Sequence, residues 1–418
     1  SACSLLAEIC AYAKDKGNDH SIMDHCSIMW TIDEAFSSRN AHSLTLQRTL
    51  ISEALNQAGH PNYSEGTRHG YAATIGGGEM SAALSVGSYH HNLLVDNEGR
   101  NWSISGGLDG AGYYDGHHDV FNNVVYNWGN RACDGGAHEV NFVGNYYKMG
   151  PATSMKYILN AQLEGTGQGS QAYYMHDNIR QNYVGDMKQN AGTVAGKHGE
   201  LVSDKEGETY KYTTSHGQVV NWKVFTDKPF FPSYAKVESA RAAFKNVLSD
   251  VGANQPCIDQ HDQRMVEETL NGTYKYVGSK TGKKGLIDDN LDAGNDAWKE
   301  FEALTDRRPA NWDTDQDGMP DWWEKLAGTN PSAADNNELS DGEYTQLERY
   351  LNWLAEPHFI TSAGNKLTID LKQYFAGYNQ QPVFTLESSI QPQEGKMKLN
   401  KKGILTISLN KKAADCLI

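Results

Sequence analysis

The chain has no apolar run that approaches the roughly 20 residues needed for a membrane helix, although 39% of its 418 residues are hydrophobic. Positive charge is also in the minority, because 52 acidic residues outnumber 37 Lys and Arg residues and give a net charge of -15. This balance argues against a nucleic-acid partner and provides no long-range attraction for a polyanion. We therefore expect a soluble protein that holds any acidic substrate through local Arg, Lys or bound metal.

Cysteine is sparse, and none of the six cysteines belongs to a Cys-x-x-Cys pair, which argues against a zinc site or a redox motif. Their spacing suggests no disulfide framework, so free thiols are favoured over disulfides. The six are Cys3, Cys10, Cys26, Cys133, Cys257 and Cys416. The first seven residues lack the basic start of a secretion signal, which is consistent with a leader that has been removed.

A short strand pattern recurs along the first half of the chain, at 22–28, 88–95, 118–125 and 139–146. An Asn or an equivalent turn residue ends each strand. These residues recur at separations near one or several multiples of about 22 residues, with longer gaps where loops intrude, and a fixed period in the 20s is typical of a solenoid. These turn residues are Cys26, Thr49, Asn92, Asn123, Asn145 and Asn178. Asn tolerates the left-handed conformation, and its amide can bond to the amide of the next coil. The pattern predicts a mostly β protein with a right-handed parallel β-helix; an antiparallel β-sandwich is the less favoured alternative, because Asn-Gly hairpin signals are few.

The stretch 88–102 joins the Asn-terminated strand Ser-Tyr-His-His-Asn to an arginine at a fixed distance. Together with the recurring strands, it resembles family 1 polysaccharide lyases, the pectate lyases, and especially the large secreted forms of Bacteroidetes. The resemblance is strong over residues 20–185 and looser up to about 356, and the chain looks truncated at both ends. It implies cleavage of polygalacturonate, a pectic polysaccharide, by calcium-dependent β-elimination. The expected protein is a monomer, secreted or at the surface of a bacterial cell.

The resemblance assigns the catalytic base to Arg100, eight residues after Asn92. Because the pKa of arginine lies above ~12, such a base needs a site crowded with cations. The structural alternative is an ion pair of Arg100 with Asp96 or Glu98 on a surface loop. Residues expected to contact the sugar are Arg68, His69, Trp102 and Arg131, with Lys148 as a further cation; Trp102, Tyr113 and Tyr114 are alternatively explained as filling of the solenoid.

The resemblance places calcium ligands at Asp33 and Glu34, because hard oxygen donors suit Ca²⁺. Neighbours on a strand point to opposite faces, so one of the two is expected to ligate. Three positions depart from the family: its Asp-x-Asp pair before Asp24 is missing, its lysine position falls near Asn56 or Gln57, and its second arginine is Ser105. For His90 and His91, ladder or turn roles are favoured over metal binding, since no third ligand is evident.

After residue 185 the strand pattern gives way to Gly-, Lys- and Asp-rich loops and two amphipathic helices, 236–248 and 259–270, which end before Gly252 and Gly272. We expect them to pack on the solenoid or cap it. Alternating runs after Pro357 suggest part of an immunoglobulin-like module. The predicted division is 1–185 (parallel β-helix, lyase), 186–300 (loops and helices), 301–356 (calcium segment) and 357–418 (partial immunoglobulin-like module).

The stretch 313–324 fits an EF-hand-type calcium loop, with glycine at the sixth position. Its expected ligands are Asp313, Asp315, Asp317, the backbone of Met319, Asp321 and Glu324. A second loop, 337–348, keeps Asp341, Gly342 and Glu348 but has Leu339 at its third position, so it is interpreted as degraded. The helix after it, 344–354, is expected to pack through Leu347, Tyr350, Leu351 and Leu354.

Two other functions remain open besides the calcium-dependent lyase. One is a non-catalytic β-helix protein that binds carbohydrate or acts at a surface, which the three departures from the family favour. The other is a β-helix glycoside hydrolase, which needs clustered aspartates around a protonatable acid. The Asp-Gly pairs at 109–110, 115–116 and 134–135 are interpreted as turns and supply no such cluster.

Overall fold

A computed structural model provides the structure of the chain. It describes residues 20–411 and the strand residues 4–5 and 9–10, except for 40, 42, 77–85, 164–166, 183–186, 190–191, 195–208, 214–218, 256, 302–308, 310, 341, 343, 362, 379 and 388–391. The chain divides into two compact units. The larger comprises 3–253 and 259–301, and the smaller comprises 1–2, 254–258 and 302–418.

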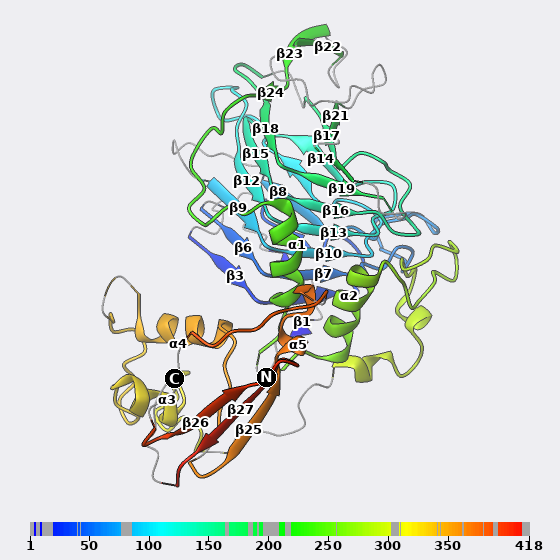
Figure 1. The fold of residues 1–418 in the computed structure, drawn as a ribbon. Coiled ribbons are helices and arrows are strands. Elements are labelled where there is room, and N and C mark those ends of the chain that lie inside the picture. Colours follow the sequence, from blue (N-terminus) through cyan, green and yellow to red (C-terminus); the bar gives the residue numbers. More distant parts are fainter. Residues whose placement is uncertain are drawn as a thin grey trace. The chain divides into compact units, whose positions relative to one another are not determined.

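Three stacked sheets build the larger unit, and along the chain successive strands pass from sheet to sheet (Figure 1). The first sheet has the order β1 (Ser4–Leu5), β4 (Ser27–Met29), β7 (Leu50–Ser52), β10 (Leu93–Val95), β13 (Val124–Tyr126), β16 (Tyr146–Lys148), β19 (Ile179–Gln181) and β20 (Met187–Gln189). The second has β2 (Ile9–Cys10), β5 (Phe36–Ser37), β8 (Ala73–Gly76), β11 (Ser103–Ser105), β14 (Cys133–Gly136), β17 (Leu159–Ala161) and β21 (Gly192–Val194).

The third sheet has the order β24 (Phe225–Thr226), β18 (Ala172–His176), β15 (Glu139–Val143), β12 (His117–Phe121), β9 (Val86–His90), β6 (Thr45–Gln47) and β3 (Ile22–Asp24). All pairings in the three sheets are parallel except β19 with β20. The architecture is a parallel β-helix, as the repeats predicted. Its sheets extend past residue 185, because β21 pairs with β17 and β24 with β18; a hairpin, β22 (Thr209–Thr213) with β23 (Val219–Lys223), lies between these two strands in the chain.

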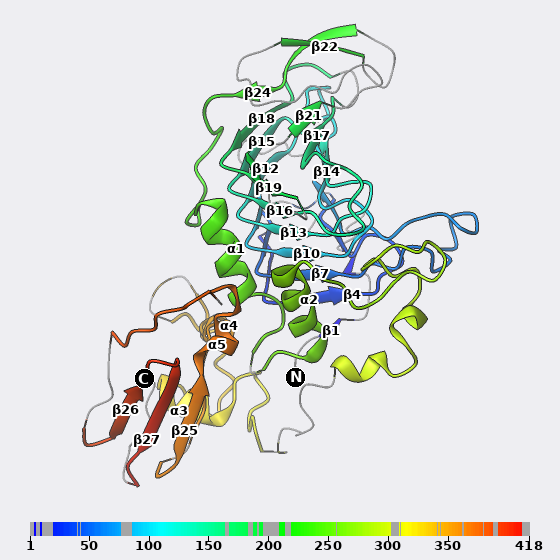
Figure 2. The same cartoon turned by 45° about the vertical axis from the view of Figure 1, so that its right-hand side comes forward.

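The interior of the solenoid is filled by columns of like residues. The central residues of five first-sheet strands are in register and belong to one buried cluster: Ile28, Ile51, Leu94, Val125 and Tyr147. The flanking residues of these strands are buried too, which explains why the strands do not alternate between apolar and polar. Figure 2 shows these strands one above another.

Two helices lie against this sheet. α1 (Ala240–Ser249) contacts β13 and β16, and Phe244 packs its ring against Tyr146 at 4.5 Å. α2 (Gln260–Asn271) ends at Gly272, which takes the left-handed conformation. Both helices thus contact strands of the solenoid, α1 through β13 and β16 and α2 through Lys148. The first helix starts later than the predicted residue 236, because Ser239 caps it by accepting from the amide of Ala242.

A two-residue turn joins the third sheet to the first in every coil from 25–26 to 177–178. The second residue of the turn forms the predicted ladder: Asn92 donates its amide to Asn123 Oδ1 (3.0 Å), Asn123 to Asn145 (3.1 Å) and Asn145 to Asn178 (2.9 Å). The left-handed residue is the one before it, in contrast to the expectation for Asn itself. These residues, with φ between 45° and 61°, are His25, Arg48, His91, Asn122, Gly144 and Asp177.

Two short 3-10 helices, η1 (Asn290–Ala293) and η2 (Ala297–Phe301), are the last elements of the larger unit along the chain. The smaller unit contains α3 (Asp321–Ala327), α4 (Gln346–Ala355), α5 (Leu371–Tyr374) and η3 (Ala376–Tyr378). Its sheet has three antiparallel strands in the order β25 (Lys366–Asp370), β27 (Ile404–Leu409), β26 (Gly395–Leu399). The immunoglobulin-like module remains a prediction. Leu351, predicted to pack, is 51% exposed, whereas Tyr350 is buried.

Cys26, Cys133 and Cys257 take part in no disulfide, as predicted. Cys3, Cys416 and the side chain of Cys10 lie outside the described residues. Within the described part of the chain, no helix has the length and apolar character required to cross a membrane.

Candidate active site

A column of polar residues occupies the corner between the first and second sheets. Asp33 and Glu34 lie between β4 and β5, His69 and Tyr71 between β7 and β8, and Arg100 between β10 and β11. Backbone hydrogen bonds hold these turns in register, from Ala35 N to Tyr71 O (3.2 Å) and from Ala73 N to Arg100 O (2.8 Å). Because neighbouring coils are about 4.8 Å apart, side chains that are distant in sequence meet here.

The acidic end of the column contains Asp33, Glu34 and His69, whose ligand atoms lie within 4.8 Å of one another. Asp33 Oδ1 is 2.7 Å from His69 Nε2 and accepts from the amide of Glu34 at 2.8 Å. Glu34 Oε1 accepts from Thr74 Oγ1 at 2.9 Å. Both carboxylates face the same space because the two residues belong to a turn; the strand rule that predicted a single ligand does not apply.

Arg100 forms an ion pair with Glu34 through Nη1. Its guanidinium lies over the Tyr71 ring, 4.4 Å from the centroid. Burial and the nearby Arg131 lower the pKa of Arg100, against the opposite effect of Asp33 and Asp134. Its backbone has φ 53°, a region that costs a non-glycine residue free energy and occurs often at functional sites.

Arg131 comes from the next coil and extends the positive end of the column. Its Nε and Nη2 donate to Asp134 at 2.6 and 2.8 Å, and its guanidinium lies 5.3 Å from the Tyr71 centroid. Tyr71 therefore contacts two guanidinium groups. Gly99 is required beside them, because a Cβ there would come within 2.9 Å of Arg131 Cβ.

An insertion between β7 and β8 contributes the aromatic part of the site. The ring of Tyr63 lies 4.0 Å from His69, and His60 Nε2 is 3.7 Å from Asp33 Oδ2. Burial, His60 and Arg131 lower the pKa of His69, so its ring is neutral near pH 7. A neutral imidazole has a lone pair available for a metal or a proton.

No protein-family model matches the chain. A protein of Aspergillus flavus named "Probable pectate lyase C" is 29% identical over 341 residues, which cover 80% of this chain and 65% of that protein. The protein of the same name from Aspergillus fumigatus is 28% identical over 340 residues, with the same shares of 80% and 65%. By sequence, the chain is therefore similar to proteins named pectate lyase. It spans about two thirds of the length of these relatives, 65% in both cases.

The relative from Emericella nidulans, also named "Probable pectate lyase C", is 29% identical over 346 residues, 82% of this chain and 66% of that protein. These relatives are fungal, and a bacterial source for this chain remains a prediction. A solved thermostable pectate lyase aligns with 57% of this chain and 52% of its own, at 12% identity and a TM-score of 0.35. A score of this size adds nothing to the fold described above.

Of the residues predicted from the pectate lyase motif, Asp33, Glu34, His69, Arg100 and Arg131 lie together in the column. Arg68 does not join them: its side chain is exposed, and it has no ion-pair partner among the described residues. Trp102 was wrongly predicted to contact sugar, because it is 0% exposed and lies in the core near Tyr89. Tyr114 is likewise buried, whereas Tyr113 is 49% exposed.

Lys148 is also a structural residue. Its Nζ donates to the carbonyls of Thr269 and Leu270 at 2.7 and 2.8 Å, at the carboxyl end of α2, where a cation is stabilising. The surface pairs considered for Arg100 are absent, since Glu98 binds Lys283 at 2.6 Å and Asp96 binds Asn127.

His90 and His91 serve the turn beside the ladder. Their Nδ1 atoms are 2.9 Å apart, and the ring of His90 stacks on Phe121 at 4.7 Å. Burial lowers the pKa of His90 to about 3 and that of His91 to about 4, so both are neutral. This arrangement agrees with the turn role.

Sequence reasoning missed Tyr71, Tyr63, His60 and Asp134. The available signal was length: residues 53–72 separate β7 from β8, whereas 30–35 separate β4 from β5. A long insertion rich in His and Tyr at one corner of a regular solenoid indicates a functional loop.

The predicted calcium loop forms a second acidic cluster, in the smaller unit. Carboxylate oxygens of Asp313, Asp315 and Asp317 lie within 4.8 Å of one another. Glu324 forms a group with Asp317 and Asp335. Asp321, predicted as a ligand, instead accepts from Thr314 N and Oγ1, both at 2.8 Å. Met319 is buried, and its amide donates to Asp317.

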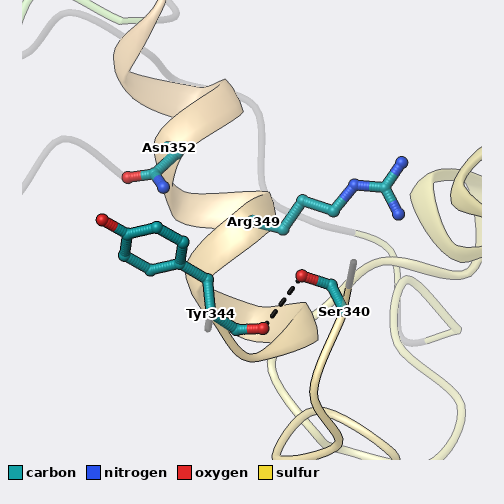
Figure 3. A pocket seen from close by; sticks show the side chains of 4 residues that line it. All are labelled: Ser340, Tyr344, Arg349 and Asn352. Atoms are coloured by element: carbon teal, nitrogen blue, oxygen red, sulfur yellow. Dashed lines mark hydrogen bonds between the residues drawn. The ribbon is translucent and has the colours of Figure 1, made fainter. Parts of the chain in front are cut away.

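A pocket in the smaller unit lies beside the degraded second loop. Figure 3 shows its lining residues, Ser340, Tyr344, Arg349 and Asn352, with the hydrogen bond of 2.9 Å from Ser340 Oγ to the carbonyl of Tyr344. None of the predicted site residues lines it. Asp341 of that loop lies outside the described residues.

Proposed function

We propose that the protein cleaves polygalacturonate by calcium-dependent β-elimination, with Arg100 as the base. The observation that supports this most is the column itself: a guanidinium, two carboxylates and a neutral imidazole meet at one corner of a parallel β-helix related in sequence to the pectate lyases. The proposed protein is a secreted monomer whose parallel β-helix carries the catalysis.

The donor set suits a divalent cation. Asp33 and Glu34 supply carboxylate oxygens, as Ca²⁺ prefers, and His69 adds a nitrogen within 4.8 Å of them. Calcium bound there neutralises charge that develops on the C6 carboxylate of the substrate when the C5 proton leaves. His69, first considered as a sugar contact, is thereby proposed as a member of the metal site.

Arg100 removes the C5 proton in the proposed reaction. The electron pair of the C5–H bond then forms the C4–C5 double bond, and the glycosidic oxygen leaves C4. Without substrate, Arg100 forms an ion pair with Glu34, and this pair stabilises the protonated form of Arg100. Glu34 as a metal ligand would no longer neutralise Arg100, whereas burial and Arg131 lower the pKa of the guanidinium in any case.

Tyr71 and Arg131 position the base and the substrate. The Tyr71 ring restricts Arg100 to one plane, and its contact with both guanidinium groups fixes their spacing. Arg131 remains 32% exposed in its side chain despite its pair with Asp134, so it can face a uronate carboxylate. Because Nε and Nη2 donate to Asp134, Nη1 is the group that would bind a substrate carboxylate.

The test is to incubate the full chain with polygalacturonate, with Ca²⁺ or with a chelator. The proposal expects an increase in absorbance from unsaturated uronate that requires Ca²⁺. New reducing ends without that chromophore would instead support a glycoside hydrolase. Retention of the polymer without any cleavage would support the carbohydrate-binding alternative, which the missing Asp-x-Asp pair and the serine at position 105 still favour.

A further inference from the structure

The acidic cluster of the smaller unit is separate from the proposed lyase chemistry. It consists of two groups of three carboxylates, Asp313 with Asp315 and Asp317, and Asp317 with Glu324 and Asp335. Asp317 belongs to both groups, so the five carboxylates surround adjoining space. Three of them come from the loop 313–317, one from α3 and one from the segment after it.

Glu324 is the residue that points to a ligand. It is 0% exposed, and neither Oε1 nor Oε2 has a hydrogen-bond partner among the described residues. Asp315 Oδ2 and Asp335 Oδ1 are buried and unpartnered in the same way. A buried carboxylate without a partner costs several kcal/mol, so a positive charge placed among several of them is stabilising.

The described residues do not supply that charge. No ion pair joins any of the five carboxylates to a described Lys, Arg or His. The amides nearby are directed to other oxygens: Asp313 accepts from Gln316 and Gly318, and Asp317 accepts from Met319. A bound cation would balance the charge of the cluster.

Asp335 reaches the cluster because the following residue holds the two loops together. Asn336 donates its amide to Asp317 Oδ2 (3.1 Å) and its side chain to the Asp317 carbonyl (2.9 Å). Its own carbonyl accepts from Leu347 N at the start of α4 (3.0 Å). Asn336, the residue just before the degraded second loop, thus connects the start of α4 to the first loop.

We propose that this cluster is a structural calcium site with Asp313, Asp315, Asp317, Glu324 and Asp335 as ligands, in which Asp335 replaces the Asp321 expected from the EF-hand pattern. Carboxylate oxygens from two segments provide the flexible, oxygen-rich coordination that Ca²⁺ favours over Mg²⁺. The ion joins α3 to the segment that leads into α4, above the buried side chains Met319, Trp323 and Tyr350. Its purpose is stability of the smaller unit.

The first test compares two matched substitutions in the full chain, Asp335→Asn and Asp321→Asn. Terbium(III) chloride serves as the probe, because Trp322 and Trp323 adjoin Glu324 and can sensitise its luminescence. In Asp335→Asn, the Ca²⁺ concentration needed to displace half of the terbium should rise ~10-fold or more, since a charged ligand is lost. Asp321→Asn should leave it unchanged, because Asn can still accept from Thr314. The reverse ranking would overturn the assignment of Asp335.

A second variant separates calcium binding from simple misfolding. In the full wild-type chain, Ca²⁺ should raise the melting temperature of the smaller unit by roughly 5 °C over its value in chelator, because the ion binds only the folded state. Glu324→Gln should abolish this increase, yet melt in chelator no lower than wild type, because it removes like-charge repulsion. If Glu324→Gln lowers the melting temperature in chelator and Ca²⁺ still raises it by the wild-type amount, Glu324 is not a calcium ligand and the proposed site is wrong. Neither readout depends on lyase activity.

Discussion

Two sets of turns flank the first sheet, and both connect it to a neighbouring sheet. Their side chains differ, since one set contains a neutral ladder and the other contains charged residues. The corner toward the third sheet carries the neutral ladder Asn92, Asn123, Asn145 and Asn178, in which every rung is buried and hydrogen-bonded. The corner toward the second sheet carries charges, partly exposed and strained at Arg100. The difference shows how a repeat protein separates tasks: one edge holds the coils in register, and the other is free to present reactive groups.

The largest effect is expected from Arg100→Lys at the charged corner. Lysine keeps the charge but loses the planar group that lies on Tyr71, so a positioned base fails while a surface ion pair would hardly change. Turnover on polygalacturonate should fall at least ~100-fold, with the melting temperature nearly unchanged. Wild-type turnover in this variant would mean that the charged corner is not the catalytic one.

The ladder corner should respond in the opposite way to Asn123→Ala. This change removes the acceptor of Asn92 and the donor to Tyr89 O, and it leaves buried polar groups without partners. We expect a loss of about 2–3 kcal/mol in the free energy of unfolding, measured by urea denaturation, with activity retained below the transition. Asn62→Ala in the exposed loop is the control and should change stability by less than about 0.5 kcal/mol.

Glu34→Gln sharpens the comparison within the charged corner. Glutamine keeps the acceptor for Thr74 but removes one charge from the metal site and from Arg100. The calcium concentration for half-maximal activity should rise ~10-fold or more, while saturating calcium restores much of the rate. Glu65→Gln, in the exposed part of the same corner, should have no effect; equal effects of the two substitutions would rule out Glu34 as a ligand.

The smallest effect is expected from His25→Asn beside the ladder. Burial alone would lower the pKa of His25, but its hydrogen bonds to Asp24 and Asp250 raise it to about 9. Because the folded pKa exceeds the unfolded value near 6.5, this stabilisation is complete below about pH 6.5 and is lost as the pH rises through 9. Asn suits the left-handed φ of 47°. The variant should be less stable than wild type at pH 6 and match it at pH 10; a constant difference would exclude the titration.

The solenoid and its ladder could be predicted because they repeat. Asn92, Asn123 and Asn145 occupy one position in successive coils, and a period is visible in a single sequence. The burial of Trp102 could not be predicted, since an aromatic residue after a turn is equally compatible with an outward and an inward direction. Which residue of each turn would be left-handed also depended on the backbone, and the structure places His91 there instead of Asn92.

The candidate site was predicted in part for a related reason. Arg100, Asp33 and Glu34 were found from the family motif, and the geometry that joins them depends on coil stacking, which the motif does not encode. Tyr71 has no motif of its own and becomes visible only when two arginines from different coils lie on its ring. In the calcium loop, Asp335 lies outside the EF-hand spacing, so only the fold brings it to Glu324.

The unequal turn lengths also bear on how such a protein can change over generations. Every turn into the ladder has two residues, while the turns at the charged corner vary from the six residues 30–35 to the twenty residues 53–72. An insertion at a ladder turn would shift every later rung, whereas one at the charged corner lengthens a loop and leaves the rungs in place. Descendants of this chain can therefore acquire or lose substrate-contacting loops by insertion and deletion at one corner, without having to evolve a new scaffold.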